Sequence, residues 1–173
     1  MTDARIDEVH ASGLRGLVAD DSALEALVAE SDPVVYRVVT APGGLAAGIG
    51  LAVTTIEPGS VGDELYMTRG HVHRDSAAET YVCTEGLGGL LLSDGGQAEW
   101  IELRPGDVAS IPAGRAHRTV NVGREPFSFL AVYELGAGND YETVARRGMG
   151  ARVVRSGEGY RVVPTGRTGQ AVG

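Results

Sequence analysis

The chain has 173 residues, of which 43% are hydrophobic, and its formal net charge at pH 7 is −8. This length and composition are typical of one folded domain with a sizeable core, and they exclude a disordered or fibrous protein. The acidic balance argues against a nucleic-acid partner, because such proteins present a basic face to phosphates. No apolar stretch is long enough for a membrane helix and the polar N-terminus has no signal-peptide core, so we expect no membrane partner and a cytoplasmic location.

Cysteine and lysine usage limits the chemistry that is open to this chain. The single cysteine, Cys83, rules out an internal disulfide framework. All fifteen basic residues are arginine, so Schiff-base formation on a lysine is excluded. Catalysis would have to use a metal, carboxylates, histidines or tyrosines.

The first part of the chain, up to about residue 32, reads as helical. Ser22 and Glu25 form a capping-box pattern, leucines follow at helical spacing, and Pro33 ends the segment. We therefore predict an N-terminal helical arm over residues 1–33.

Residues 34–163 read as many short strands separated by turn signals. The predicted strands are rich in Val, Ile, Leu, Tyr and Thr and cover residues 34–40, 48–56, 64–69, 79–84, 88–93, 98–103, 107–112, 117–122 and 127–135. This spacing predicts an all-β antiparallel sandwich or barrel. A short helix is expected within 137–148, a last strand pair follows, and residues 164–173 are predicted to be a flexible tail.

Three histidines and one glutamate form a candidate metal site. His71 and His73 are two residues apart, so in an extended segment both imidazoles project to the same side. Glu79 begins the next predicted strand, and His117 lies in a later one. A single histidine is more commonly a surface or hydrogen-bonded residue, and we assign His10 in that way. The four together make a mixed nitrogen and oxygen ligand set suited to Fe, Mn, Ni, Zn or Cu.

The arrangement of these residues resembles the two motifs of the cupin barrel. The first motif is similar to Gly-x-His-x-His with a later Glu and Gly, and here it reads Gly70-His71-Val72-His73, followed by Glu79 and Gly86. The second has the form Pro-x-Gly-x-x-His-x-x-x-Asn, and here it spans 112–121. The resemblance implies a cupin fold, a double-stranded β-helix or jelly-roll barrel, with a short N-terminal helical segment. The cupin fold alone does not define a function.

Residues outside the two motifs make the likeness more specific. The chain is similar to the cupin-type, metal-dependent glucose-6-phosphate isomerase family over residues 30 to 150, in loops as well as core strands. The segments that carry the likeness are DPVVY (32–36), PGSVG (58–62), TRGHVH (68–73), AHRTVN (116–121), EPFSFLA (125–131) and AGNDY (137–141).

This resemblance implies a homodimeric enzyme that interconverts glucose 6-phosphate and fructose 6-phosphate, a step of glycolysis and gluconeogenesis. It implies one divalent metal ion per subunit, Fe²⁺ before Mn²⁺, Ni²⁺ or Zn²⁺. The implied roles fall on three sets of residues: metal ligands His71, His73, Glu79 and His117; phosphate-binding Thr55, Thr68, Gly70 and Tyr133; and Tyr81 near the sugar.

Two reaction routes are open at this stage. In a cis-enediolate route, Glu79 is the candidate base and Tyr81 relays a proton to oxygen. In a metal-assisted hydride shift no base is needed. Two other functions also remain open: a metal-dependent cupin oxygenase, which would use the same ligands without a sugar phosphate, and a non-catalytic sugar-binding cupin.

The sequence departs from the pattern of the isomerase family in four ways. The gap from His73 to Glu79 is one residue short, Arg69 replaces a usual lysine, and Asn139 stands where a histidine can occur. Gly114 and Arg115 replace a bulky aromatic pair before His117, a change that we expect to alter the shape of the sugar pocket.

Overall fold

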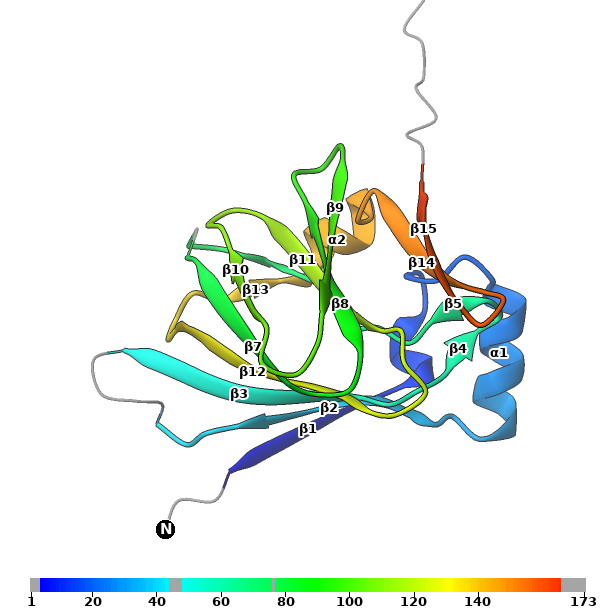
Figure 1. The fold of residues 1–173 in the computed structure, drawn as a ribbon, viewed down its shortest axis with the longest axis horizontal. Helices are drawn as coiled ribbons and strands as arrows, with labels where there is room; N and C mark the ends of the chain where they lie inside the picture. The colour runs from blue at the N-terminus through cyan, green and yellow to red at the C-terminus, as the bar shows by residue number, and fades with distance from the viewer. Residues whose placement is uncertain (1–3, 44–47, 76, 166–173) are drawn as a thin grey trace, which may run out of the picture.

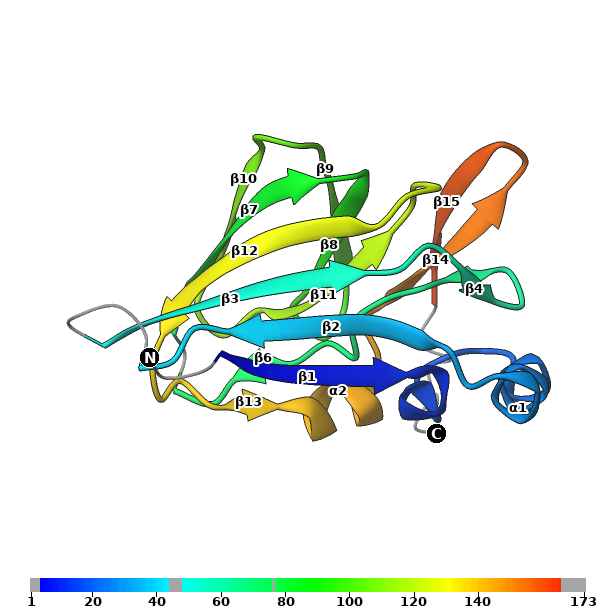
Figure 2. The same ribbon diagram turned by 90° about the horizontal axis from the view of Figure 1, so that it is seen from below.

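The computed structural model describes residues 4–43, 48–75 and 77–165. Its largest element is a six-stranded antiparallel sheet, which forms one curved layer in Figure 2. In sheet order its strands are β1 (Arg5–His10), β2 (Val34–Thr40), β3 (Ile49–Ile56), β12 (Phe127–Glu134), β7 (Glu79–Glu85) and β10 (Val108–Ile111).

Three smaller sheets complete the β-structure (Figure 1). The three-stranded sheet consists of β11 (Ala116–Asn121), β8 (Gly88–Ser93) and β9 (Ala98–Leu103). A two-stranded sheet joins β13 (Asn139–Asp140) to β6 (Val72–His73). The four-stranded sheet consists of β15 (Gly159–Pro164), β14 (Ala151–Ser156), β5 (Glu64–Leu65) and β4 (Ser60–Val61). The helices are a 3-10 turn η1 (Ala11–Leu14), α1 (Asp21–Glu30) and α2 (Tyr141–Arg147).

The main core lies between the six-stranded and three-stranded sheets. Phe127 and Phe129 of β12 are buried there with Leu90 of β8 and Ile111 of β10. Each such side chain contributes about 1.5–3 kcal/mol through removal of its apolar surface from water. On β11, the buried His117 lies opposite Leu92 of β8, so the pairing of these two strands carries the imidazole into the interior.

Close backbone approach explains why glycines interrupt β8. A Cβ atom on Gly88 would lie 2.3 Å from the Phe127 ring, and one on Gly89 would lie 2.2 Å from the Trp100 ring. Only a residue without a side chain lets the strand pack this closely against those two aromatic rings.

The all-β prediction is confirmed, and three predicted strands, 34–40, 88–93 and 98–103, match the observed bounds. The strand predicted at 64–69 is much shorter, because only Glu64–Leu65 pairs as a strand. Beyond it the chain leaves the four-stranded sheet and crosses to β11, where Met67 forms an isolated bridge with Val120. Thr68 and the residues that follow are thereby directed toward the candidate metal site.

The predicted helical arm over residues 1–33 is wrong for its first part. Residues 5–10 form β1, which pairs antiparallel with β2 at the edge of the six-stranded sheet. The helix α1 begins after Asp20, whose side chain caps it by accepting from the Ala23 N–H at 2.8 Å, so Ser22 is not the cap. The helix ends at Glu30, close to the predicted stop at Pro33.

The predicted tail, 164–173, lies outside the described residues from 166 onward. Pro164 is the last residue of β15, and the Thr165 N–H donates to the Gly150 carbonyl. Within the described part of the chain, no helix is long and apolar enough to cross a membrane.

Candidate metal centre and substrate pocket

Three strands bring the four predicted ligands together. His71 and His117 pair through reciprocal backbone hydrogen bonds of 3.1 and 2.9 Å, so the AHRTVN strand is fixed against the HVH segment. His73 is the second residue of β6, and Glu79 is the first of β7. The predicted same-side projection of His71 and His73 therefore holds, with β13 supporting β6 from its other edge.

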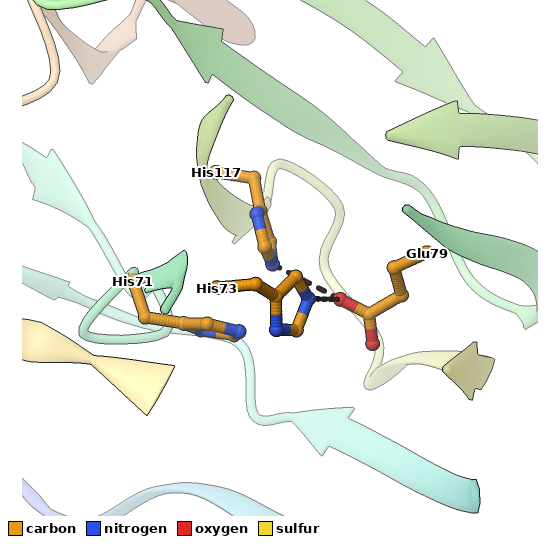
Figure 3. Close-up of side chains that lie close together, drawn as sticks. All are labelled: His71, His73, Glu79 and His117. Atoms are coloured by element: carbon orange, nitrogen blue, oxygen red, sulfur yellow. Dashed lines mark hydrogen bonds and ion pairs between the residues drawn. The ribbon is translucent and has the colours of Figure 1, made fainter. Parts of the chain in front are cut away.

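The four side chains converge on one point (Figure 3). One ligand atom from each lies within 4.8 Å of all the others. The Glu79 Oε2 atom is 3.1 Å from His73 Nε2 and 3.1 Å from His117 Nε2. His71 completes the cluster, with its ring centroid 4.2 Å from that of His117.

Burial and mutual contact set the charge of this cluster. Glu79 is 5% exposed, and burial alone would raise its pKa, but the facing imidazoles of His117 and His73 lower the pKa to about 2. Burial and the neighbouring His117 lower the pKa of His71 to about 3, so this imidazole is neutral. The contact with Glu79 raises the pKa of His73. The cluster therefore offers an ionised carboxylate and at least one neutral imidazole at neutral pH.

The residues fit a divalent transition metal. The His117 Nε2 atom is buried and faces the other three ligands. The Glu79 Oε2 atom lies 3.1 Å from it, but an ionised carboxylate oxygen is an acceptor and cannot donate to a nitrogen lone pair. Its Nδ1 atom lies 3.2 Å from the Arg115 carbonyl oxygen, which favours a proton on Nδ1 and a free lone pair on Nε2. A buried nitrogen lone pair with no partner, beside a carboxylate, is what a metal ligand presents before metal binds.

A cavity of about 880 Å³ opens onto the four side chains. Of the residues with predicted roles beyond metal binding, Thr68, Gly70, Tyr81 and Tyr133 line it. Tyr81 shares the inward face of β7 with Glu79, and its ring packs 4.4 Å from that of Phe129. Burial, and next the charge of Glu79, raise the pKa of Tyr81 well above its usual value, so its hydroxyl stays protonated.

Thr55 does not reach this cavity, and the expectation that it faces the substrate is corrected. Its hydroxyl lies 2.9 Å from the Ser128 hydroxyl on the outer face of the six-stranded sheet. Thr54, one residue earlier on β3, is 6% exposed and lines the cavity. Successive residues of a strand point to opposite faces, so the two threonines cannot both line it.

The signal for Thr54 was present in the strand but was ambiguous. Ala52, Thr54 and Ile56 share the inward face, whereas Leu51 and Val53 share the outward face with Thr55. Both faces carry apolar side chains, so alternation of polarity does not tell which threonine points inward.

Two further aromatic residues that sequence reasoning did not assign also line the cavity. Tyr36 of β2 lies on its wall, and Tyr141 opens α2 at its rim. The Arg69 guanidinium lies 4.5 Å from the centroid of the Tyr141 ring, and the His71 ring is 5.6 Å from the same ring. These groups surround the chain between Thr68 and His71 with hydroxyl and guanidinium donors.

The backbone at Gly70 is arranged to offer a free donor. Gly70 has a φ of +75°, a left-handed conformation that a side chain would strain. No described residue accepts a hydrogen bond from its N–H group, although the residue lines the cavity. A buried amide without a protein acceptor at a cavity wall is available to a ligand.

Comparison with known proteins identifies relatives over almost the whole chain. The model of the family described as "Glucose-6-phosphate isomerase (GPI)" matches residues 9–166. The glucose-6-phosphate isomerase of Pyrococcus abyssi is 42% identical over 159 residues, which is 90% of this chain and 84% of that protein. The glucose-6-phosphate isomerase of Thermococcus litoralis is 42% identical over 146 residues, 83% of this chain and 77% of that protein.

Solved structures support the fold. An oxalate oxidase, a cupin, superposes with a TM-score of 0.54 at 19% identity and covers 66% of this chain and 58% of its own. At this identity the likeness concerns the barrel alone, and it confirms the predicted cupin architecture. Together with the family match and the 42% identical relatives, it shows that the chain belongs to the glucose-6-phosphate isomerase family in its cupin-type form.

Proposed function

We propose that this protein is a metal-dependent isomerase that interconverts glucose 6-phosphate and fructose 6-phosphate. The observation that carries the proposal is a cluster of three imidazoles and one carboxylate at the base of a cavity. The named activity of the relatives supports the choice of substrate. The reaction places the protein in glycolysis and gluconeogenesis, and we propose the cytoplasm as its location because its phosphorylated substrates are made and used there.

The phosphate of the substrate would bind at the wall opposite the carboxylate. Thr54, Thr68, Tyr133 and the Gly70 N–H are the proposed donors, with Thr54 in the place that the resemblance gave to Thr55. The Thr68 hydroxyl already accepts from the Thr119 N–H at 3.1 Å, which fixes its position and leaves its proton to donate. Neutral donors suit a dianion because their hydrogen bonds to it are charge-assisted.

The sugar end would lie between Glu79 and Tyr81. Isomerisation moves hydrogen between C1 and C2 and exchanges a proton between the two oxygens. Glu79 is ionised and would accept the carbon-bound proton, and Tyr81 is protonated and would donate to the developing oxyanion. Both side chains project from the same face of β7, which supports their proposed pairing as base and acid.

His71, His73, Glu79 and His117 would hold one divalent ion per subunit, and we propose Fe²⁺, with Mn²⁺, Ni²⁺ or Zn²⁺ as alternatives. When bound, this ion would supply Lewis-acid stabilisation of negative charge on the sugar oxygens. One potential ligand atom of each of the four side chains already lies within 4.8 Å of the other three, which supports this assignment.

We also propose that two copies form a homodimer through the outer face of the six-stranded sheet. One aliphatic side chain from each strand lies in a continuous cross-strand register. This aliphatic row consists of Ile6, Val39, Val53, Leu130, Val82 and Val108. Four of the six are exposed, Ile6 at 61% and Val108 at 65%. A continuous row of apolar side chains across a whole sheet is typical of a protein interface.

The neighbouring row explains why a second copy is the partner that fits. The Glu8 carboxylate pairs with the Arg37 guanidinium beside the aliphatic row, so one negative and one positive side chain lie at its border. The aliphatic row presents apolar side chains from every strand of the sheet. The same row on a second copy, related by a two-fold rotation, can pack against it, as an isologous dimer requires.

The test is conversion of fructose 6-phosphate to glucose 6-phosphate by purified, Fe²⁺-loaded protein, with oxygen consumption followed in the same vessel. The proposal predicts equilibration of the two sugar phosphates without oxygen uptake. Oxygen uptake without isomerisation would instead support a cupin oxygenase. Binding of the sugar phosphate without conversion would indicate a non-catalytic sugar-binding protein.

A further inference from the structure

Arg118 is a buried cation that the proposed mechanism does not use. It follows His117 on β11, is 5% exposed, and is absent from the cavity wall. None of the ion pairs among the described residues includes it, and its Nε atom is buried without a hydrogen-bond partner there. The acid that acts on it most strongly, Glu64, pairs instead with Arg152 at 3.5 Å.

Burial of an unpaired charge costs free energy, so we expect an anion to compensate the buried Arg118 guanidinium. Among the described residues the Arg118 side chain makes one hydrogen bond, and that bond points to where the anion would be. Its Nη2 atom donates to the Arg69 carbonyl oxygen at 2.8 Å. That carbonyl belongs to the same peptide group as the Gly70 N–H, which lines the cavity and has no acceptor among the described residues.

The side chain of Arg118 also shapes the conformation of this peptide. A Cβ atom on Gly70 would lie 3.2 Å from both Cβ and Nε of Arg118, and 3.1 Å from the His117 carbonyl oxygen. The left-handed turn at Gly70 is therefore packed directly against the arginine stem. A donor on the carbonyl oxygen polarises the peptide and strengthens its N–H as a donor to an anion on the other side.

We propose that Arg118 is a positioning residue for phosphate recognition: through its bond to the Arg69 carbonyl it orients and polarises the Arg69–Gly70 peptide, so that the Gly70 N–H binds the phosphate of the substrate. The inference rests on the proposed function. The Arg118 cation lies behind the Gly70 N–H rather than in the cavity wall, so it would add positive charge near the phosphate without occupying space in the pocket.

The experiment compares two variants of metal-loaded enzyme. Arg118→Gln removes the charge and keeps a side-chain amide, whereas Arg118→Lys keeps the charge. Arg152→Gln is the matched control, because it removes the partly exposed cation that pairs with Glu64 and leaves the bond from Arg118 to the Arg69 carbonyl in place. The readouts are KM and kcat for fructose 6-phosphate, the Ki of inorganic phosphate as a competitive anion, and the metal content.

For Arg118→Gln we expect KM and the phosphate Ki to rise together by about tenfold, a change of about 1.4 kcal/mol, with kcat and metal content close to those of the wild type. Arg118→Lys should keep KM and the phosphate Ki close to the wild-type values, and Arg152→Gln should leave KM and the phosphate Ki unchanged. An unchanged KM and Ki in Arg118→Gln, or a fall in kcat or metal content alone, would show a structural role and overturn the inference. A wild type that binds phosphate but does not isomerise would overturn the proposed function instead.

If the glutamine variant does not fold, the wild type still decides the question. In protein labelled with ¹⁵N-arginine, the Arg118 Nε resonance should shift on saturation with inorganic phosphate, and the Arg152 resonance should not. An Arg118 signal that does not respond to saturating phosphate would contradict the proposal.

Discussion

At the scale of single residues, the site depends on carboxylate and imidazole groups whose charges are set by one another. Glu79 is held ionised by the imidazoles it faces, despite burial that opposes ionisation. Tyr81, two residues along the same strand, is held protonated by burial and by the negative charge of Glu79. One strand face therefore carries an ionised carboxylate beside a protonated phenol, as the proposed base and acid require.

Replacement of Glu79 by glutamine tests this pairing. Glu79→Gln removes both the anionic ligand and the proposed base, so we expect metal content to fall and kcat to drop by at least about a hundredfold. Elemental analysis and the isomerase assay measure the two effects. Glu85→Gln, on the exposed end of the same strand, is the control and should change neither. A Glu79→Gln enzyme with near-normal turnover would remove Glu79 from the mechanism.

The two adjacent threonines of β3 provide a second test. Thr54→Val removes a proposed phosphate donor and should raise KM for fructose 6-phosphate by about tenfold, the value of a hydrogen bond to a charged group. Thr55→Val breaks the bond to Ser128 on the outer face, so it should lower the free energy of unfolding by about 1 kcal/mol and leave KM unchanged. A raised KM in Thr55→Val together with an unchanged KM in Thr54→Val would instead support the phosphate-binding role first assigned to Thr55.

The cluster of three histidines and Glu79 could be predicted because its signal is largely local in the sequence. His-x-His spacing specifies a shared side in any extended segment, and the later Glu and His complete a recognised motif. Arg118 could not be predicted, since its role depends on a contact between β11 and a loop 49 residues away. Prediction of Thr54 would have required knowing which face of β3 points inward. The sequence does not tell this, because both faces carry apolar residues.

At the scale of elements, the paired strands are specified by period-two patterns and turn residues, whereas the N-terminal segment depends on tertiary contact. β1 has a mixed polar and apolar sequence, RIDEVH, that gives no strong strand signal alone. It is held by its antiparallel register with β2, in which Ile6 lies opposite Val39. Pairing with a partner strand here overrides weak local preference.

Glycine in β8 gives a prediction at this scale. Gly88→Ala would place a methyl group 2.3 Å from the buried Phe127 ring, so we expect a loss of about 1–3 kcal/mol in the free energy of unfolding. Gly159→Ala is the control, because a Cβ atom at this exposed strand position meets nothing within 4 Å. Its effect should stay within about 0.5 kcal/mol. Urea titration measures both, and equal stabilities would show that β8 can move away from β12.

At the scale of the whole molecule, the six-stranded sheet contributes to two different surfaces, one on each of its faces. Its inward face lines the cavity with Thr54, Tyr81 and Tyr133, and its outward face carries the aliphatic row. Both faces are therefore apolar or functional, which is unusual for a sheet with one side in water. The proposed second copy on the outward face would account for this composition.

Disruption of the aliphatic row tests the dimer. Wild-type protein should sediment at twice the 18.0 kDa mass of one chain, and Val53→Glu should sediment as a monomer because it places a charge in the middle of the row. Val163→Glu, at a similarly exposed valine on β15, should remain dimeric. A monomeric wild type, or a Val53→Glu protein that stays dimeric, would place the interface elsewhere or remove it.

The measurement that bears most directly on the central claim is the metal dependence of fructose 6-phosphate isomerisation. Purified protein would be stripped with a chelator, assayed, and assayed again after addition of Fe²⁺ or Mn²⁺, with folding checked at each stage. We predict that isomerisation disappears on stripping and returns with metal. Undiminished activity in the fully stripped protein, or no activity in folded protein loaded with any of the divalent metals named above, would contradict the account.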